Sequence, residues 1–234
     1  MNYPLFLFFG LVPSIIWLAY YLRKDVHPEP NSVIQKVFLL GMLATLPAIA
    51  LELGLRSLFS FLPFSEGVIL ILYIFLGVAL VEEVLKFLVV RFFVYRNKAL
   101  DEPVDLMLYM IIAALGFAAF ENILLLFGLG PSSPISSIVA LTLVRLVGAT
   151  LLHALSSGTF GYFLVRSFFD GKRKYLYVAT GLFVATFLHG LFNFYILQIE
   201  GLTKLLIPAI ILMGLAIFVS LSFKQLQKII KLRP

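Results

Sequence analysis

Seven long apolar stretches follow one another along the chain, and short polar connectors separate them. A helix needs about 20 mostly apolar residues to cross the hydrocarbon core of a bilayer. The pattern therefore predicts an all-α fold, a polytopic bundle of about seven transmembrane helices. The fifth stretch is long enough that its helix must tilt strongly or extend beyond the bilayer. The predicted spans are residues 4–22, 33–51, 68–92, 105–127, 135–165, 175–198 and 204–223.

Basic residues in the connectors predict how these helices are oriented. Fourteen lysines and arginines fall on one side of the predicted membrane, and only Arg56 and Lys204 fall on the other. Cytoplasmic loops of membrane proteins carry such an excess of Lys and Arg. We therefore expect the N-terminus outside and the C-terminus in the cytoplasm. The fourteen residues are Arg23, Lys24, Lys36, Arg91, Arg96, Lys98, Arg166, Lys172, Arg173, Lys174, Lys224, Lys228, Lys231 and Arg233.

The composition agrees with a multi-pass protein of the cell membrane. Hydrophobic residues make up 62% of the 234 residues and charged residues 13%, whereas soluble domains carry about 25% charged residues. The mean hydropathy is +1.06. We expect one transmembrane domain over residues 1–234, surrounded by the lipid bilayer. The net charge is +6, and because the basic residues lie in the connectors, it indicates topology and not a nucleic-acid partner. The chain has no cysteine, which excludes disulfides, thiolate zinc sites and a cysteine nucleophile.

Four successive predicted spans carry polar side chains at positions that hydrocarbon should exclude. A charged group at the centre of a bilayer costs about 3 kcal/mol or more, so such groups usually face the interior of the bundle and mark function. The first, second and seventh spans have almost none, since Glu52 falls at a predicted span edge. The catalytic or binding spans are therefore expected within residues 68–198. The polar residues are Glu82, Glu83, Lys86, Glu121, Asn122, Arg145, His153, His189 and Asn193.

The spacing of these residues is helical. Lys86 follows Glu82 by four residues and Glu83 by three, so its ammonium reaches either carboxylate. His189 and Asn193 are also four residues apart and share one helix face.

Small residues lie beside the polar ones and predict close helix packing. They form the stretch 113–119 and the pairs Ala154/Gly158 and Ser157/Gly161. Small residues at such spacing let transmembrane helices approach closely, which would gather the polar faces around a wet cavity. Counting residues along each span nevertheless places Glu82 and His153 toward the cytoplasmic half, and Glu121, His189 and Asn193 toward the outer half.

These side chains suit amide hydrolysis by an activated water. A carboxylate accepts a proton from water, a histidine assists, and His or Asn donors stabilise the oxyanion that develops. Two adjacent carboxylates raise each other's proton affinity, which would disable the base, and a neighbouring Lys or Arg counters this. Lys86 and Arg145 are the candidate counter-charges.

Four motifs in sequence order resemble the PrsW family of intramembrane proteases, within the wider CPBP superfamily of glutamate-dependent membrane proteases. They are EEVLK at 82–86, FAAFEN at 117–122, His153, and HGLFN at 189–193. The segment DVHPEP at 25–30 is similar to the acidic, proline-rich loop of that family.

The resemblance implies a metal-independent protease, without cofactors, that cleaves membrane-anchored protein substrates. It assigns Glu82 and Glu83 to a general base and its support, His153 to water activation, and His189 with Asn193 to the oxyanion. Lys86, Glu121, Asn122 and Arg145 would be supporting residues; the role of Glu121 stays open, because the wider superfamily often has histidine there. Family members are associated with the release of anti-sigma factors, which is a candidate substrate class.

Other readings of the same residues remain open. Glu82, Glu83 and Lys86 also suit a structural ion pair, and Glu121 with Asn122 an interhelical hydrogen-bond pair. A zinc site from His153, His189 and a glutamate is compatible with residue type, although no HExxH motif is present. Chains of ionisable residues in spans also occur in proton-coupled transporters and channels. A third possibility is a non-catalytic scaffold subunit of a membrane protease complex.

Overall fold

The computed structural model describes residues 3–25 and 27–231, and every regular element in this part of the chain is helical. This confirms the predicted all-α fold. Arg233, counted above for the orientation, and Val26, within the DVHPEP segment, lie outside the described residues. The elements are α1 (Tyr3–Leu22), α2 (Asn31–Phe59), α3 (Glu66–Leu72), the π-helical η1 (Tyr73–Ala79), α4 (Leu80–Phe93), α5 (Pro103–Leu129), α6 (Ile135–Val147), α7 (Ala149–Phe169), the 3₁₀ turn η2 (Gly171–Arg173), α8 (Lys174–Gln198) and α9 (Thr203–Lys231).

Seven helical segments are long and apolar enough to cross a membrane, which confirms the predicted number. α3, η1 and α4 together make up one of these segments, and α6 with α7 makes up another. Most segments are longer than predicted. α2 continues to Phe59, so Glu52 lies within this helix, seven residues before its end, whereas the predicted span ended at residue 51. The chain is a multi-pass membrane protein.

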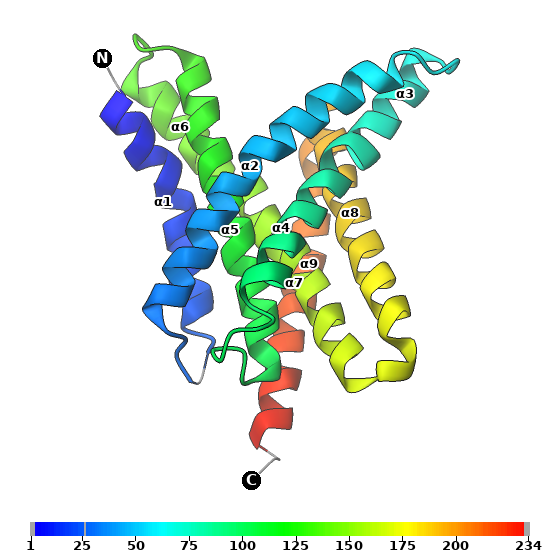
Figure 1. Ribbon diagram of the computed structural model, residues 1–234. Coiled ribbons are helices and arrows are strands. Elements are labelled where there is room, and N and C mark those ends of the chain that lie inside the picture. The colour runs from blue at the N-terminus through cyan, green and yellow to red at the C-terminus, as the bar shows by residue number, and fades with distance from the viewer. Residues whose placement is uncertain (1–2, 26, 232–234) are drawn as a thin grey trace.

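Helix α5 is the centre of the bundle. In its most apolar stretch 72% of the residues are buried, against 33% at most in any other span. It packs most extensively against α7, α2 and α1 (Figure 1). A capping box starts the helix, because the Asp105 carboxylate accepts the backbone N–H of Glu102 at 2.6 Å and the Glu102 side chain accepts that of Asp105. Gly130, at a φ of 90°, ends it in a conformation that favours glycine.

Glycines allow the helices to pack closely around α5, as the small-residue stretches predicted. A Cβ added at Gly116 would lie 2.0 Å from the Phe38 carbonyl oxygen of α2. A Cβ at Gly161 of α7 would lie 2.7 Å from the Met107 Cα of α5. The first contact brings α2 close to α5, and the second brings α7 close to α5.

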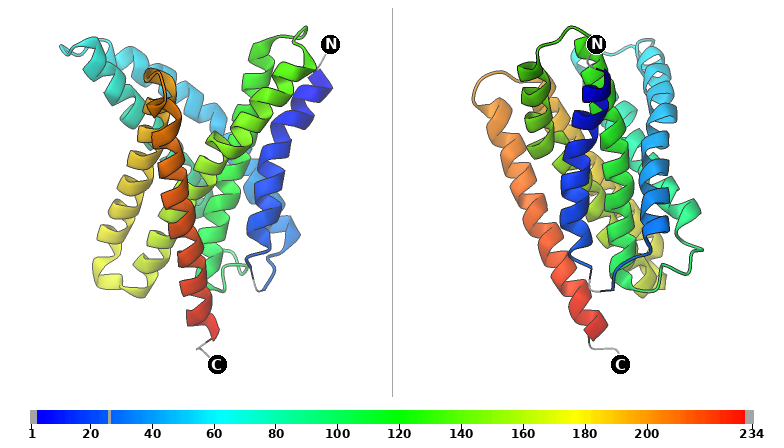
Figure 2. Two further views of the ribbon diagram at one scale, coloured as in Figure 1. Left: turned by 180° about the vertical axis from the view of Figure 1, so that it is seen from behind. Right: turned by 90° about the vertical axis from the view of Figure 1, so that its left-hand side faces the viewer.

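The outer helices are not parallel to one another. The C-terminal half of α2 and the adjoining α3 diverge from α1, α5 and α6 toward the end of the bundle where the N-terminus lies (Figure 1). The C-terminus lies at the opposite end. α9 packs across α7 and α8 on the rear face, opposite α2 and α4 (Figure 2).

Candidate active site

The first turns of α4 carry the paired glutamates into the interior of the bundle. Glu82, Glu83 and Lys86 are 3%, 0% and 0% exposed, so all three face inward as predicted. The π-helical η1 directly precedes them along the same segment. Such π-helical turns are frequent at functional sites.

The Lys86 ammonium is the hub of the buried cluster. Its Nζ donates to Glu82 Oε2 at 3.1 Å and to Glu83 Oε1 at 2.9 Å. It also lies 2.8 Å from His153 Nδ1 on α7 and 4.7 Å from the centroid of the Phe117 ring. The three hydrogen-bond partners match the three donors of an ammonium group. Lys86 therefore links α4 to α7 and balances the carboxylate charge.

Glu83 is saturated with hydrogen bonds. Besides Lys86, its carboxylate accepts from His189 Nδ1 at 3.0 Å, Ser156 Oγ at 3.1 Å and Ser157 Oγ at 2.7 Å. From the sequence, the two serines suggested only a serine nucleophile, an alternative that we disfavoured because hydroxyls in membrane helices usually bond to backbone carbonyls. Neither serine was assigned to the glutamate site. Their spacing could have predicted this position, because they follow His153 by three and four residues and so share its helix face.

Glu82 is less constrained than its neighbour. Among the described residues its only hydrogen bond comes from Lys86. Its Oε2 also lies 3.5 Å from His153 Nδ1 and 3.7 Å from His189 Nε2. Glu82 thus keeps acceptor capacity in the space between the two histidines, whose ring centroids are 4.9 Å apart.

The hydrogen-bond pattern assigns the histidine tautomers. Because Lys86 donates to His153 Nδ1, the proton of His153 lies on Nε2, which donates to Glu121 Oε2 at 2.9 Å. In the neutral imidazole of His189, Nδ1 donates to Glu83, and Nε2 is then an acceptor that faces Glu82.

Helices α5, α6 and α7 add a second, connected group of polar side chains. Arg145 of α6 donates to Glu121 Oε2 at 2.9 Å and also to the side-chain oxygen of Asn122. Asn122 in turn donates to Thr150 Oγ1 at 3.1 Å. Arg145 therefore forms the ion pair with a glutamate that the sequence suggested, and through His153 this group joins the Lys86 cluster.

A break at Gly148 shapes this part of the site. The long fifth span is not one continuous helix, because α6 ends at Val147 and α7 begins at Ala149. A Cβ at Gly148 would lie 2.8 Å from the Val144 carbonyl oxygen, so the break requires the absence of a side chain. The break lets Arg145 before it and His153 after it reach the same carboxylate, Glu121.

The structure removes the depth mismatch that residue counting produced. Glu82, His153, Glu121 and His189 belong to one network of contacts. Six of the seven spans are 26–35 residues long, well beyond the about 20 that a perpendicular helix needs. Long helices tilt and cross, so residues at unequal counts from the span ends meet at one level.

Asn193 is the predicted site residue with the least structural support. It lies one turn after His189 on α8 and is half-buried, and no described hydrogen bond or ion pair involves it. Its place at the oxyanion stays a prediction.

The DVHPEP segment forms a separate acidic cluster near the start of α5. Tyr109 donates to Glu29 Oε2 at 2.6 Å, and His27 contacts Glu102. Burial raises the pKa of Glu29 above its usual range. Tyr109 and Glu121 are 12 residues apart on one helix, about 18 Å, so this cluster is not part of the intramembrane site.

One group of side chains in the site has the composition of a metal centre. Glu82, His153 and His189 each offer a ligand atom, and these atoms lie within 4.8 Å of one another. Two histidines and a glutamate are a known catalytic zinc set. Lys86, however, already contacts both Glu82 and His153, so a cation bound there would have to displace or tolerate its ammonium.

Comparisons with known proteins identify the family. The sequence model described as "PrsW family intramembrane metalloprotease" matches residues 29–221. Protease PrsW of Geobacillus kaustophilus is 31% identical over 194 residues, covering 82% of this chain and 79% of the relative. That of Oceanobacillus iheyensis is 31% identical over 208 residues, 87% and 88% of the two chains. Protease PrsW of Bacillus subtilis is 27% identical over 201 residues, 85% and 86%.

No solved structure matches the chain significantly. The curated relatives favour the protease prediction over the transporter and scaffold alternatives, since all of those named above are called proteases. The chain belongs to the PrsW family of intramembrane proteases.

Proposed function

We propose that this protease cleaves membrane-anchored proteins with a water molecule held between Glu82 and His189. The observation that carries the proposal is the pair of acceptors, Glu82 Oε2 and His189 Nε2, 3.7 Å apart. A water between them would donate one proton to each, which directs its oxygen lone pairs away from both and toward a substrate carbonyl.

Glu82 is the proposed general base, and Glu83 is its support. Glu83 accepts four hydrogen bonds, which leave it little capacity for a water. Its bond to His189 Nδ1 keeps Nε2 free of a proton. Glu82, with one hydrogen bond, retains the capacity to accept the proton of the attacking water.

The proposed reaction has two steps. The water oxygen bonds to the carbonyl carbon while Glu82 accepts a water proton, and the carbonyl oxygen becomes an oxyanion. The C–N bond then breaks, and Glu82 returns the proton to the leaving amine. The Asn193 amide would donate to the oxyanion. His189, which the family resemblance also assigned to the oxyanion, is instead proposed as the acceptor that holds the water. His153 contacts Lys86 and Glu121 and holds both in place. It therefore acts on the water indirectly, because Lys86 donates a hydrogen bond to Glu82.

We further propose that this chemistry is metal-independent and that Lys86 supplies the positive charge. The description of the matched family names metalloproteases, so a metal is the specific alternative. Glu82, His153 and His189 would hold the ion, which would polarise the water and the scissile carbonyl. Lys86 argues against it, because its ammonium already binds two of those three ligands.

Chelation separates the two mechanisms. Purified protein reconstituted in liposomes is treated with EDTA or 1,10-phenanthroline and assayed for cleavage of a single-span reporter. We expect unchanged activity. A loss that added Zn²⁺ restores would overturn the metal-independent mechanism.

The proposed substrates are membrane-anchored proteins, with anti-sigma factors as the class that the family resemblance suggests. The orientation proposed from the basic residues, with the C-terminus in the cytoplasm, would allow release of a cytoplasmic fragment. The central test is the single replacement of Glu82 in the reconstituted assay. Full activity of Glu82→Gln would overturn the proposed function.

A further inference from the structure

A cavity of about 230 Å³ lies between α2, α5 and α6, next to the site. Glu121 and Arg145 form its polar inner part, and Glu121 also contacts His153 of the site. The walls include Leu124 and Leu125, which are 41% and 46% exposed and so face out of the bundle. Its lining residues on α2, Thr45, Ile49 and Glu52, belong to the half of that helix that diverges from α5 and α6 (Figure 1). The cavity thus extends from the outward-facing side chains of α5 to Glu121, which contacts His153 of the site.

Glu52 of α2 lines the same cavity and has no role in the mechanism above. Among the described residues it forms no hydrogen bond or ion pair. The basic residue one turn further along α2, Arg56, places its guanidinium 5.9 Å from the ring centroid of Tyr73. An ionisable group inside a spanning helix is costly, so its retention there points to a functional partner.

The charged residues that line the cavity offer Glu52 no ion-pair partner. Arg145 and Glu121 neutralise each other in an ion pair with 2.9 Å between their atoms. Lys86 lies deeper and is held by Glu82, Glu83 and His153. The cavity wall therefore presents one excess carboxylate, which complements a cation.

We propose that this cavity binds the unwound segment of the membrane-anchored substrate and that Glu52 selects a lysine or arginine side chain near the cleaved bond. The apolar walls accept the alkyl stem of such a side chain, and the carboxylate pairs with its head. This inference rests on the proposed function, because it assigns a specificity residue to that same site.

The test compares single-span reporters that differ at one position near the cleavage site. Lysine and methionine are placed there in turn, because their stems are similar in length and only lysine carries a charge. We expect the wild type to cleave the lysine reporter about tenfold more efficiently at one position, which is the size of a modest charge-pair coupling. Glu52→Gln should reduce that preference to below about twofold. Most of the loss should fall on the lysine reporter, because methionine carries no charge for the carboxylate to pair with.

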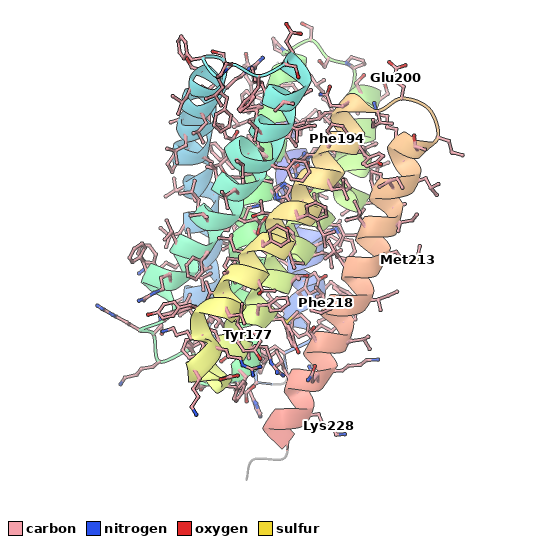
Figure 3. All side chains as sticks on the ribbon, turned by 90° about the vertical axis from the view of Figure 1, so that its right-hand side faces the viewer. Tyr177, Phe194, Glu200, Met213, Phe218 and Lys228 are labelled. Atoms are coloured by element: carbon pink, nitrogen blue, oxygen red, sulfur yellow. The ribbon has the colours of Figure 1, made fainter. Side chains whose placement is uncertain are left out.

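Charge reversal and a matched control sharpen the result. Glu52→Lys should transfer the preference to a reporter with glutamate at that position. Glu200→Gln makes the same chemical change in the α8–α9 connector, away from the cavity, and should keep the lysine preference (Figure 3). A lysine preference that survives Glu52→Gln, or a wild type with no preference at any position, would overturn the inference.

Crosslinking tests the route without requiring cleavage. A photoreactive amino acid at Leu125 should crosslink the reporter in a Glu82→Gln background, whereas one at Met213 on the outer face of α9 should not (Figure 3). Equal crosslinking at both positions would overturn the proposed route.

The methionine reporter distinguishes the two proposals. If the wild type cleaves it and Glu82→Gln does not, the proposed function stands, whatever the result for Glu52. If the wild type cleaves no reporter, both proposals are overturned.

Discussion

His189 Nε2 lies 3.7 Å from Glu82 Oε2, while the other ring nitrogen of His189 donates to Glu83 at 3.0 Å. One histidine therefore touches both carboxylates through different nitrogens. This arrangement gives two adjacent glutamates different environments, although they are neighbours in the sequence. The consequences for each residue can be measured separately.

Glu82→Gln and Glu83→Gln should differ in kind. Glu82→Gln removes the proposed base, so the cleavage rate should fall by about two to four orders of magnitude. Glu83→Gln leaves Lys86 and His189 with a neutral partner in the interior, and breaking a buried ion pair costs about 3 kcal/mol or more. Thermal unfolding in detergent should therefore show a larger loss for Glu83→Gln. A larger loss of stability for Glu82→Gln would contradict this division of roles.

Ser157→Ala should reduce activity only modestly. The hydroxyl donates to Glu83 at 2.7 Å, and losing one buried hydrogen bond costs about 1–3 kcal/mol. Three other donors still hold the carboxylate. Cleavage assays of Ser156→Ala and Ser157→Ala separately should both retain turnover. Complete inactivity of a well-folded variant would instead indicate a serine nucleophile.

Gly148→Ala should lower both stability and activity. The added Cβ would lie 2.8 Å from the Val144 carbonyl oxygen, so the break between α6 and α7 would have to shift. That shift would separate Arg145 and His153 from Glu121. Gly54→Ala is the matched control, because nothing lies within 4 Å of its added Cβ and alanine favours a helix by about 1 kcal/mol over glycine. The unfolding temperature and the cleavage rate should both fall in Gly148→Ala. Neither should fall in Gly54→Ala.

The connector before α2 should make stability depend on pH. Burial raises the pKa of Glu29 and that of Asp25, so the folded protein binds protons more tightly there than the unfolded chain. Stability is then greatest below the ordinary carboxylate pKa and falls as pH rises through the raised values. Glu29→Gln mimics the protonated form and can still accept the hydrogen bond from Tyr109.

Thermal unfolding from acidic to neutral pH measures this effect. The wild type should lose stability as pH rises, and Glu29→Gln should lose less. Glu66→Gln, an exposed carboxylate at the start of α3, is the control and should follow the wild type. An identical pH dependence in Glu29→Gln and the wild type would rule out a contribution from Glu29.

Much of the fold and many of the site residues were predictable from local pattern. Hydrocarbon excludes charge and demands long apolar helices, so the number of spans follows from hydropathy alone. The same exclusion singles out Glu82, Glu83, Glu121, His153 and His189, because each breaks an apolar run. Helical spacing also predicted that Lys86 reaches both glutamates.

The sequence by itself therefore determined the all-α membrane fold and which polar residues lie in its spans. Only the tertiary structure decided that these residues meet, because depth along a tilted helix does not follow from counting. It also decided that Glu83 accepts more hydrogen bonds than Glu82, because the additional donors, Ser156, Ser157 and His189, lie on other helices. The position of Glu52 in the cavity was also decided by the tertiary structure. Its helix extends beyond the predicted apolar span, and the other residues that line the cavity include residues of α5 and α6. Contacts between helices depend on crossing geometry, which no local pattern contains.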